Sequence, residues 1–515
     1  MTIRVGTVGT SPGWEELLRQ EGVPFGLITP GGSGALSAVV VCRPPTREET
    51  SWLREYLRGG GGVMGSAGFL TGLVELREEP IRLRYLEPGE HPLVGGLSLM
   101  DVETSSRLPR EANCLRTEEN AFGVFAGEML GGWGVVSPFD PGTALEDFRA
   151  AERYFFARQE RLPSERVSRV SKGEILKYVH IMLQHLHHAR GYPYAHVSHV
   201  PAGCRNVSAF RIDTDGGTKE EIDELYTIAR ENGTGFTWFL DVKSHESWLS
   251  RFAEMERQEV GLHCYEHRVF LDPAKDGANI RRGIDTMTAS GLKPRAFAAP
   301  FGFWSPALGH CIDDAGFAYS SEFSWAYDTL PHRPVTGGVR FRTLQIPVHP
   351  VSIGNLRKAG YTPAQMAGYY AEVVDRKLRR REPLIFYHHP GHREWEVVRS
   401  LCRNVRSPDI RAMTLSEYGA WWERRGALRA CLTFDAGMLE AQSDEGAWDT
   451  DFAVRVSRWE GEEAEIGFNR PVAINGIAWH ASAAYQPPVD IKRTREFDLR
   501  GEIGRQFTRL QRRFL

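Results

Sequence analysis

The 515-residue sequence predicts an α/β protein with a central distorted (β/α)7-type barrel, an N-terminal doubly wound parallel-sheet domain and a small C-terminal β-rich unit. Two observations lead to this prediction. Short apolar runs alternate with helical segments in residues 1–65 and again in residues 205–427, and such alternation is typical of parallel sheets covered by helices. Beyond residue 430 the apolar runs are short and separated by Gly, Asn and Asp, which favours antiparallel strands.

The N-terminal domain is predicted to span residues 1–145 and to begin with strand–helix repeats. Strands are expected at Ile3–Val8 and Ala38–Cys42, and helices at Trp14–Gln20 and Thr46–Leu57. Helices between consecutive strands place parallel strands side by side with helices on both faces. This part of the chain resembles the glutamine-amidotransferase-like, flavodoxin-like fold.

A glycine-rich turn, Gly65-Ser66-Ala67-Gly68, follows the next apolar run of this domain. A nucleophile elbow needs Gly two residues before the nucleophile, where this chain has Met64, and an amidotransferase would need Cys in place of Ser66. We therefore expect the N-terminal domain to be non-catalytic and to serve binding or assembly.

Residues 146–204 are predicted to form a helical connector. Ser171 and Glu174 have the spacing of a capping box, and the apolar residues between Ile175 and Leu186 form one stripe of a helix. This helix carries a group of histidines, but no carboxylate lies at a ligand offset and adjacent ones point to different faces. We expect a solvated face here and not a metal site. The histidines are His180, His185, His187 and His188.

The central barrel is predicted to span residues 205–427. One of its helices, Thr218–Asn232, opens with a capping box formed with Glu221 and closes at Asn232-Gly233. In a parallel barrel the carboxyl ends of the strands and the loops after them carry the chemistry. The predicted strands are Val207–Ile212, Gly235–Leu240, Val260–His263, Ala296–Ala299, Leu344–Val348 and Leu384–Tyr387.

The C-terminal unit, residues 428–515, is predicted to be a small antiparallel β domain. Its expected strands are Phe452–Ser457, Glu465–Phe468 and Ile474–His480. No cluster of residues in this unit suggests chemistry.

Polar residues gather at the ends of the predicted barrel strands. The first strand ends with Asp213 and Asp215, and a later one ends with His263 and His267. Each pair alone is weak evidence, because a D-x-D pair occurs by chance and an H-x-x-x-H pair is more often structural. Together, one carboxylate and two imidazoles form a His₂Asp site with open positions, which is catalytic in character. The last strand adds a histidine pair, His388 and His389.

These motifs, in this order within residues 205–427, resemble the polysaccharide deacetylase superfamily (NodB homology domain, carbohydrate esterase family 4). The resemblance implies that Asp213 is the general base. It also implies a divalent metal ion bound by Asp215, His263 and His267. We expect Zn²⁺, with Co²⁺ or another divalent ion as alternatives, because a His₂Asp set accommodates more than one.

The resemblance also implies the residues that complete the reaction. The general acid would be His389, with His388 as its competitor, because the sequence does not fix which ring faces the site. The backbone N–H of Phe301 would stabilise the oxyanion. The family motif places Arg where this chain has Ala298, so the cation that orients the catalytic Asp must come from elsewhere, such as Arg211 or Arg295.

The function that these features predict is hydrolytic removal of the N-acetyl group from an N-acetylated sugar or polysaccharide. Ala298 motivates one alternative, hydrolysis of another linear or cyclic C–N bond, such as an amide or imide, on the same barrel. A second alternative is a non-catalytic carbohydrate-binding or assembly protein. The flanking domains are candidates for contacts between copies of the chain in a homo-oligomer.

Charge and composition exclude several classes of partner. The chain has 63 Lys and Arg residues and 66 Asp and Glu residues, which gives a net charge of −3. We therefore expect no nucleic-acid partner. No window approaches the roughly 18 apolar residues of a membrane span, and the N-terminus lacks a signal peptide's apolar core. The seven cysteines are scattered and never spaced C-x-x-C, which is typical of free thiols. We therefore expect a cytoplasmic location.

Overall fold

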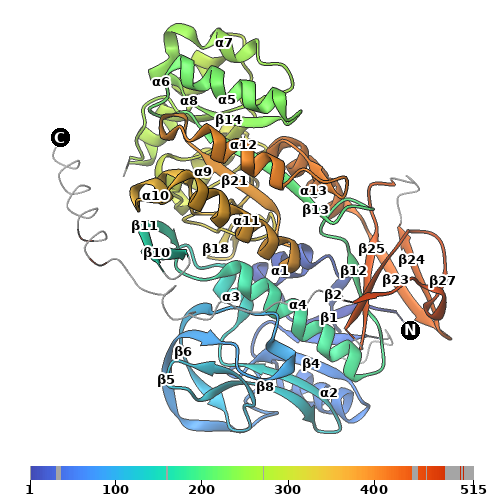
Figure 1. The fold of residues 1–515 in the computed structure, drawn as a ribbon. Coiled ribbons are helices and arrows are strands. Elements are labelled where there is room, and N and C mark those ends of the chain that lie inside the picture. The colour runs from blue at the N-terminus through green and yellow to red at the C-terminus, as the bar shows by residue number, and fades with distance from the viewer. Residues whose placement is uncertain are drawn as a thin grey trace.

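The computed structural model describes residues 2–29, 36–157, 160–270, 272–443, 450–459 and 461–481, together with Leu499 and Ile503. Figure 1 shows the N-terminal sheet at the bottom, the curled barrel above it and the C-terminal strands at the side. No helix of the described residues is long and apolar enough to cross a bilayer. All seven cysteines are free thiols, as the sequence predicts.

The N-terminal sheet is parallel in its first half, with strand order β2-β1-β3-β4-β9. Helices cover both faces of this half, because α1 packs its apolar residues in one core cluster and α2 packs its own in another. The strands are β1 Val5–Val8, β2 Phe25–Leu27, β3 Ala38–Val41, β4 Gly62–Ser66 and β9 Gly132–Ser137, and the helices are α1 Pro12–Glu21, α2 Arg47–Arg58 and α3 Pro141–Leu145.

The second half of this sheet is antiparallel, so the prediction of a wholly parallel doubly wound sheet is wrong for it. Within β5, residues 81–85 alternate apolar and charged, with Arg82 and Arg84 exposed and Leu83 buried, which is the pattern of a sheet with one solvated side. The strands are β5 Leu76–Glu87, β6 Met100–Pro109, β7 Cys114–Thr117 and β8 Phe122–Met129, with the 3₁₀ turn η1 Pro92–Val94.

The connector is only partly helical. A hairpin of β10 Ala150–Ala157 and β11 Glu160–Ser168 precedes α4 Lys172–Ala189, and β12 Tyr194–Val197 follows it. β12 pairs with β25 of the C-terminal unit, so the connector contributes a strand to that sheet.

Two expectations for α4 are wrong because tertiary partners compete with local ones. Ser171 makes no cap hydrogen bond; its hydroxyl donates to Asp101 at 2.9 Å, and Glu174 accepts from the Ser98 N–H at 2.8 Å. The expectation of a solvated histidine face is wrong for His187, while His180, His185 and His188 are half-buried. His187 is fully buried and hydrogen-bonds the Leu183 carbonyl oxygen at 2.7 Å.

The barrel is a curled parallel sheet with strand order β20-β17-β16-β15-β14-β13-β21, and β22 pairs with the first half of β13. Beyond β20, the N–H of His349 donates to the carbonyl oxygen of Ile385 at 2.9 Å and draws the two edges together. The strands are β13 Asn206–Asp213, β14 Phe236–Asp241, β15 Glu259–Cys264, β16 Ala296–Phe297, β17 Tyr319–Ser320, β20 Leu344–Gln345, β21 Leu384–His388 and β22 Ile410–Ala412.

Helices surround this sheet, and the predicted capping box at Thr218 and Glu221 is confirmed. A small hairpin, β18 Val335–Thr336 with β19 Val339–Arg340, lies in the loop before β20. The helices and 3₁₀ turns are α5 Lys219–Glu231, α6 Val242–His245, η2 Glu246–Trp248, α7 Ser250–Ala253, α8 Pro273–Ala289, η3 Pro300–Gly302, α9 Pro306–Ala315, α10 Ile353–Lys358, α11 Pro363–Arg380, η4 Pro390–His392, α12 Trp395–Asn404 and α13 Leu415–Ala427.

The C-terminal unit is antiparallel, as predicted, but its last expected strand is wrong. Residues Ile474–Gly476 form the 3₁₀ turn η5 and β28 begins only at His480, while residues 482–498 and 504–515 lie outside the described part of the chain. The N–H of Ile3 donates to the Leu432 carbonyl oxygen at 2.8 Å, so the chain start joins this unit. Its strands are β23 Ala430–Asp435, β24 Met438–Ser443, β25 Val454–Arg458, β26 Glu462–Ile466, β27 Val472–Ala473 and β28 His480–Ala481.

Arg425 of α13 joins the barrel to the flanking units. Its guanidinium is 3% exposed and donates to the carbonyl oxygens of Ser198 at 2.7 Å, Val197 at 3.0 Å and Gln20 at 3.1 Å. These carbonyls belong to the end of α1 and to β12 and the segment after it. One buried side chain therefore satisfies backbone groups from two other parts of the chain.

We predict that Arg425→Met lowers the free energy of unfolding by more than about 3 kcal/mol, because several buried carbonyl oxygens lose a donor. The matched control is Arg424→Met, whose side chain is 52% exposed and pairs with Asp451 at the surface, so its cost should stay below about 1 kcal/mol. Urea unfolding of both variants measures the difference. Equal costs would contradict the role of Arg425.

Candidate metal centre of the barrel

The predicted site residues come together at the carboxyl ends of three barrel strands. Asp213 ends β13, and Asp215 follows in the loop. His263 lies near the end of β15, with His267 in the turn after it, and His389 follows β21 directly. The parallel order β15-β14-β13-β21 brings these ends to one edge of the sheet.

Asp215, His263 and His267 have the geometry of a three-ligand metal centre. Asp215 Oδ1 lies 3.5 Å from His263 Nε2, Asp215 Oδ2 lies 3.7 Å from His267 Nε2, and the two Nε2 atoms are 3.1 Å apart. One ligand atom from each residue lies within 4.8 Å of the other two. The predicted ligand set therefore converges on one point.

The donor atoms are oriented as metal ligands need to be. Burial lowers the pKa of His263 and so favours its neutral ring, and its Nδ1 hydrogen-bonds the Ala298 carbonyl oxygen at 2.6 Å. That bond places the ring proton on Nδ1 and directs the Nε2 lone pair into the site. Asp215 Oδ1 is buried and accepts no hydrogen bond from the described residues. Two imidazole nitrogens and an orphaned carboxylate oxygen fit a divalent ion such as Zn²⁺.

Asp213 is held by a buried ion pair with Arg211 on the same strand. Arg211 Nε donates to Asp213 Oδ1 at 2.6 Å and Nη2 donates to Oδ2 at 2.7 Å. Burial alone would raise the pKa of Asp213, but the charge and hydrogen bonds of Arg211, together with the nearby His263 and His389, outweigh it and lower that pKa to about 2. Arg211 therefore supplies the cation expected to replace the family arginine at Ala298, while Arg295 is exposed.

The two adjacent histidines at the end of β21, His388 and His389, differ in orientation. His389 Nε2 lies 3.5 Å from Asp215 Oδ1 and 4.0 Å from Asp213 Oδ2, so its ring faces the site. Burial lowers the pKa of His389 to about 4, although the Asp213 charge opposes this shift. His388 points the other way on β21, and its ring lies beside His392 and Trp395.

Phe301 forms part of the rim of the site. Its φ of +61° places the backbone in the left-handed region, and its side chain is 46% exposed. The ring meets His267 edge to face, with centroids 4.8 Å apart. Strained backbone of this kind persists only where its surroundings hold it.

Sequence reasoning missed the polar layer beneath the site. Glu322 accepts from the Ala299 N–H at 3.0 Å and from Gln345 Nε2 at 2.6 Å, so it holds the β16 end whose carbonyl orients His263. Ser321 accepts from Arg211 through its hydroxyl at 3.1 Å. The polar run Ser320-Ser321-Glu322 at the end of β17 was the available signal.

A second histidine–carboxylate group, Glu21 with His196 and His199, was also missed. It lies on α1 and beside β12, outside the barrel. His196 and His199 are three residues apart, but Glu21 is far from them in the chain, so no local pattern links all three.

Comparison with known proteins finds similarity only among solved structures. No family model and no curated protein matches the sequence. A protein from Mycobacterium smegmatis assigned as a polysaccharide deacetylase is 17% identical, covering 44% of this chain and 92% of that chain, with a TM-score of 0.38. A family 4 carbohydrate esterase from Streptomyces lividans in complex with acetate is 13% identical, covering 41% and 92%, with a TM-score of 0.30.

A family 4 pseudoenzyme from Bacillus anthracis is 16% identical, covering 42% of this chain and 65% of that chain, with a TM-score of 0.31. These matches thus include an esterase and a pseudoenzyme. At such TM-scores the likenesses carry no weight for activity, and the side-chain geometry alone bears on it.

We predict strong coupling between Arg211 and Asp213 in a double-mutant cycle. Arg211→Met should cost about 3–5 kcal/mol of unfolding free energy, because it leaves a buried carboxylate without its cation. Adding Asp213→Asn should recover about 1–3 kcal/mol of the summed single costs. Chemical denaturation of the four proteins measures this coupling.

The control cycle uses Arg399 and Glu224, an ion pair at the surface whose side chains are 21% and 37% exposed. Its coupling energy should stay below about 1 kcal/mol. Additive costs at Arg211 and Asp213 would show that the pair does not hold the site.

Proposed function

We propose that this protein is a metal-dependent hydrolase that removes the N-acetyl group from an N-acetylated sugar or polysaccharide. One observation carries the proposal: a His₂Asp ligand set lies beside a buried carboxylate, Asp213, and an imidazole, His389. His389 Nε2 is within 4.0 Å of both Asp213 and Asp215. A metal ligand set flanked by a base and an acid matches the needs of amide hydrolysis.

Asp215, His263 and His267 would hold the ion. When bound, a divalent ion polarises an amide carbonyl and lowers the pKa of water toward about 7. Zn²⁺ is the ion that best suits two imidazoles and one carboxylate, and Co²⁺ can take the same ligands. Three protein ligands leave coordination positions open for reactants.

Asp213 would act as the general base. Its pKa of about 2 keeps it ionised at neutral pH, and Arg211 grips both carboxylate oxygens, which fixes the side chain in one rotamer. The base is thus positioned before the substrate arrives, and it can accept the proton of an attacking water. This role rests on positioning more than on basicity.

His389 would serve the leaving nitrogen. With a pKa of about 4, its ring is neutral at neutral pH and carries one proton, which a neutral imidazole can still donate as a hydrogen bond. Its Nε2 lies 4.0 Å from Asp213 Oδ2, so the proton that Asp213 takes from the attacking water can pass to this ring, and the imidazolium formed would give it to the departing amine. His388 lies outside this path.

Phe301 would complete the site from its rim. Its backbone N–H would donate to the oxyanion, and its half-exposed ring offers an apolar face to a sugar ring. The cation from Arg211 also removes the reason for preferring another C–N substrate, which was the missing arginine at Ala298. N-deacetylation is therefore the favoured reaction.

We predict that the two adjacent histidines differ sharply in their effect on turnover. His389→Ala should lower kcat by about 10²- to 10⁴-fold, the usual contribution of a general acid, with the bound metal retained. His388→Gln should change kcat by less than about threefold, because this ring faces away from the carboxylates. Steady-state acetate release and metal content, measured on both variants, test this. Equal losses would argue against His389.

We also predict that acetate release depends on the ion. Dialysis against a chelator should abolish acetate release from N-acetylated oligosaccharides, and Zn²⁺ added back in excess over the chain should restore it. In His263→Ala, the same addition should fail, because the ligand set is incomplete. Ammonia release from cyclic or linear amides without acetate release would favour the alternative substrate. Activity that survives both treatments would refute the proposal.

A further inference from the structure

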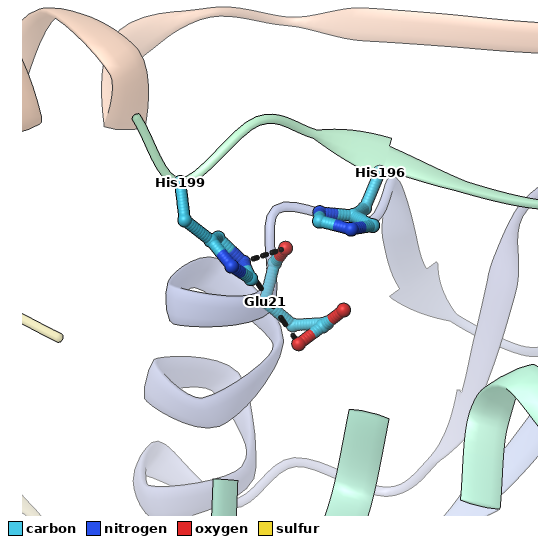
Figure 2. Close-up of side chains that lie close together, drawn as sticks. All are labelled: Glu21, His196 and His199. Carbon is cyan, nitrogen blue, oxygen red and sulfur yellow. Dashed lines mark hydrogen bonds and ion pairs between the residues drawn. The ribbon is translucent and has the colours of Figure 1, made fainter. Parts of the chain in front are cut away.

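A second group of metal-ligating side chains lies at the junction of the N-terminal sheet and the C-terminal strands. Glu21 is the last residue of α1, His196 lies in β12 and His199 follows that strand. Figure 2 shows both imidazoles turned toward Glu21. None of these residues belongs to the barrel, so the group is independent of the proposed active site.

The three side chains already converge. One ligand atom from each lies within 4.8 Å of the other two, and the His196 and His199 ring centroids are 4.6 Å apart. A tetrahedral Zn²⁺ site with bonds of about 2.0–2.1 Å places its ligand atoms about 3.3 Å apart. Side-chain shifts of about 1 Å would therefore close the site around an ion.

The carboxylate of Glu21 has one oxygen held and one left over. Tyr194 donates its hydroxyl to Oε1 at 2.6 Å, and His180 Nδ1 lies 2.7 Å from the same oxygen. Oε2 accepts no hydrogen bond from the described residues, although Glu21 is 0% exposed. His199 Nε2 is 4.0 Å from Oε2 and donates to the Glu21 backbone carbonyl oxygen at 2.9 Å, which leaves Nδ1 as the ligand atom of that ring. A buried carboxylate oxygen without a donor is costly and calls for a partner.

The guanidinium of Arg425 lies nearby but does not donate to Glu21 Oε2. Arg425 donates to the backbone carbonyl oxygen of Glu21 at 3.3 Å, and to other carbonyls around it, but not to the carboxylate. His196 is oriented like His263 of the barrel, since its Nδ1 lies 3.0 Å from the Val197 carbonyl oxygen. That bond leaves Nε2 as the ring's free ligand atom.

A path for the ion also exists. Glu21, His180, His196 and His199 line a cavity of about 560 Å³ between α4, the barrel and the C-terminal strands. We propose that Glu21, His196 and His199 form a second divalent-metal site, of Zn²⁺ type, that ties the end of α1 to β12. The fourth coordination position is open toward the cavity, where water or an anion would complete it. His180 and Tyr194 orient the carboxylate and are positioning residues.

The test separates this site from the barrel site. The starting protein is the full chain carrying His263→Ala and His267→Ala, which empties the barrel centre and makes the result independent of the proposed function. After removal of metal with a chelator, equilibrium dialysis with Zn²⁺ should give one bound ion per chain. Adding His196→Gln and His199→Gln should weaken this binding at least a hundredfold.

Two further measurements keep the test decisive. Co²⁺ added to the starting protein should give the visible absorption of a four-coordinate centre, and Zn²⁺ should raise its melting temperature; both effects should disappear in the His196→Gln/His199→Gln protein. The control is His310→Gln, an exposed histidine on α9, which should bind one ion with unchanged affinity. If the double histidine variant does not fold, Glu21→Gln replaces it, because the amide keeps the size of the side chain.

The outcomes divide cleanly. Loss of the ion in the His196→Gln/His199→Gln or Glu21→Gln protein, with retention in His310→Gln, supports the site. A starting protein that binds no Zn²⁺ at micromolar concentration overturns it, as does an ion retained after all cluster substitutions. Loss of metal from the barrel alone would count against the proposed function and leave this site in place.

Discussion

The buried pair of Arg211 and Asp213 fixes the geometry on which the barrel site depends. Both side chains point from β13 to the same side, because they are two residues apart on one strand. Taking two charges out of water is costly, and the pair is tolerated because its hydrogen bonds are bidentate and Arg211 also donates to Ser321. The rings of Phe239 and Tyr387 lie within 6 Å of the guanidinium and exclude water. Asp213 therefore has one orientation.

The rest of the centre follows from that orientation. Asp213 is ionised, so the adjacent Asp215 and the ring of His389 meet a fixed negative charge at the strand ends. Ala298 has a structural role, because its carbonyl oxygen sets the tautomer of His263. Arg211 supplies the charge beside Asp213, and the backbone after β16 sets the orientation of the ligand. The charge and the ligand orientation thus come from two different strands.

Sequence periodicity predicted the barrel strands and the site because both are local signals. A buried parallel strand is a short apolar run, and each site residue lies within a few positions of the end of such a run, as Asp213 and His263 do. To choose between His388 and His389, one must know which of the two side chains points toward the carboxylates, and this depends on the orientation of β21 in the sheet. Ser171 failed as a cap because Asp101, distant in sequence, offers competing hydrogen bonds. The antiparallel half of the first sheet was missed because the local pattern of residues does not determine which strands pair with each other.

The histidines near α1 illustrate the same limit more sharply. The composition of α4 suggested a solvated face, yet His180 reaches Glu21 of another helix, and Tyr194 reaches the same carboxylate oxygen. Arg425 from the barrel binds the carbonyls that surround this carboxylate. Three parts of the chain therefore meet at the end of α1, where a buried cation is already committed to backbone oxygens. Glu21 Oε2 has no donor among the described residues there, and His199 Nε2 lies 4.0 Å from it, so the junction keeps a buried acceptor that its own polar contacts do not satisfy.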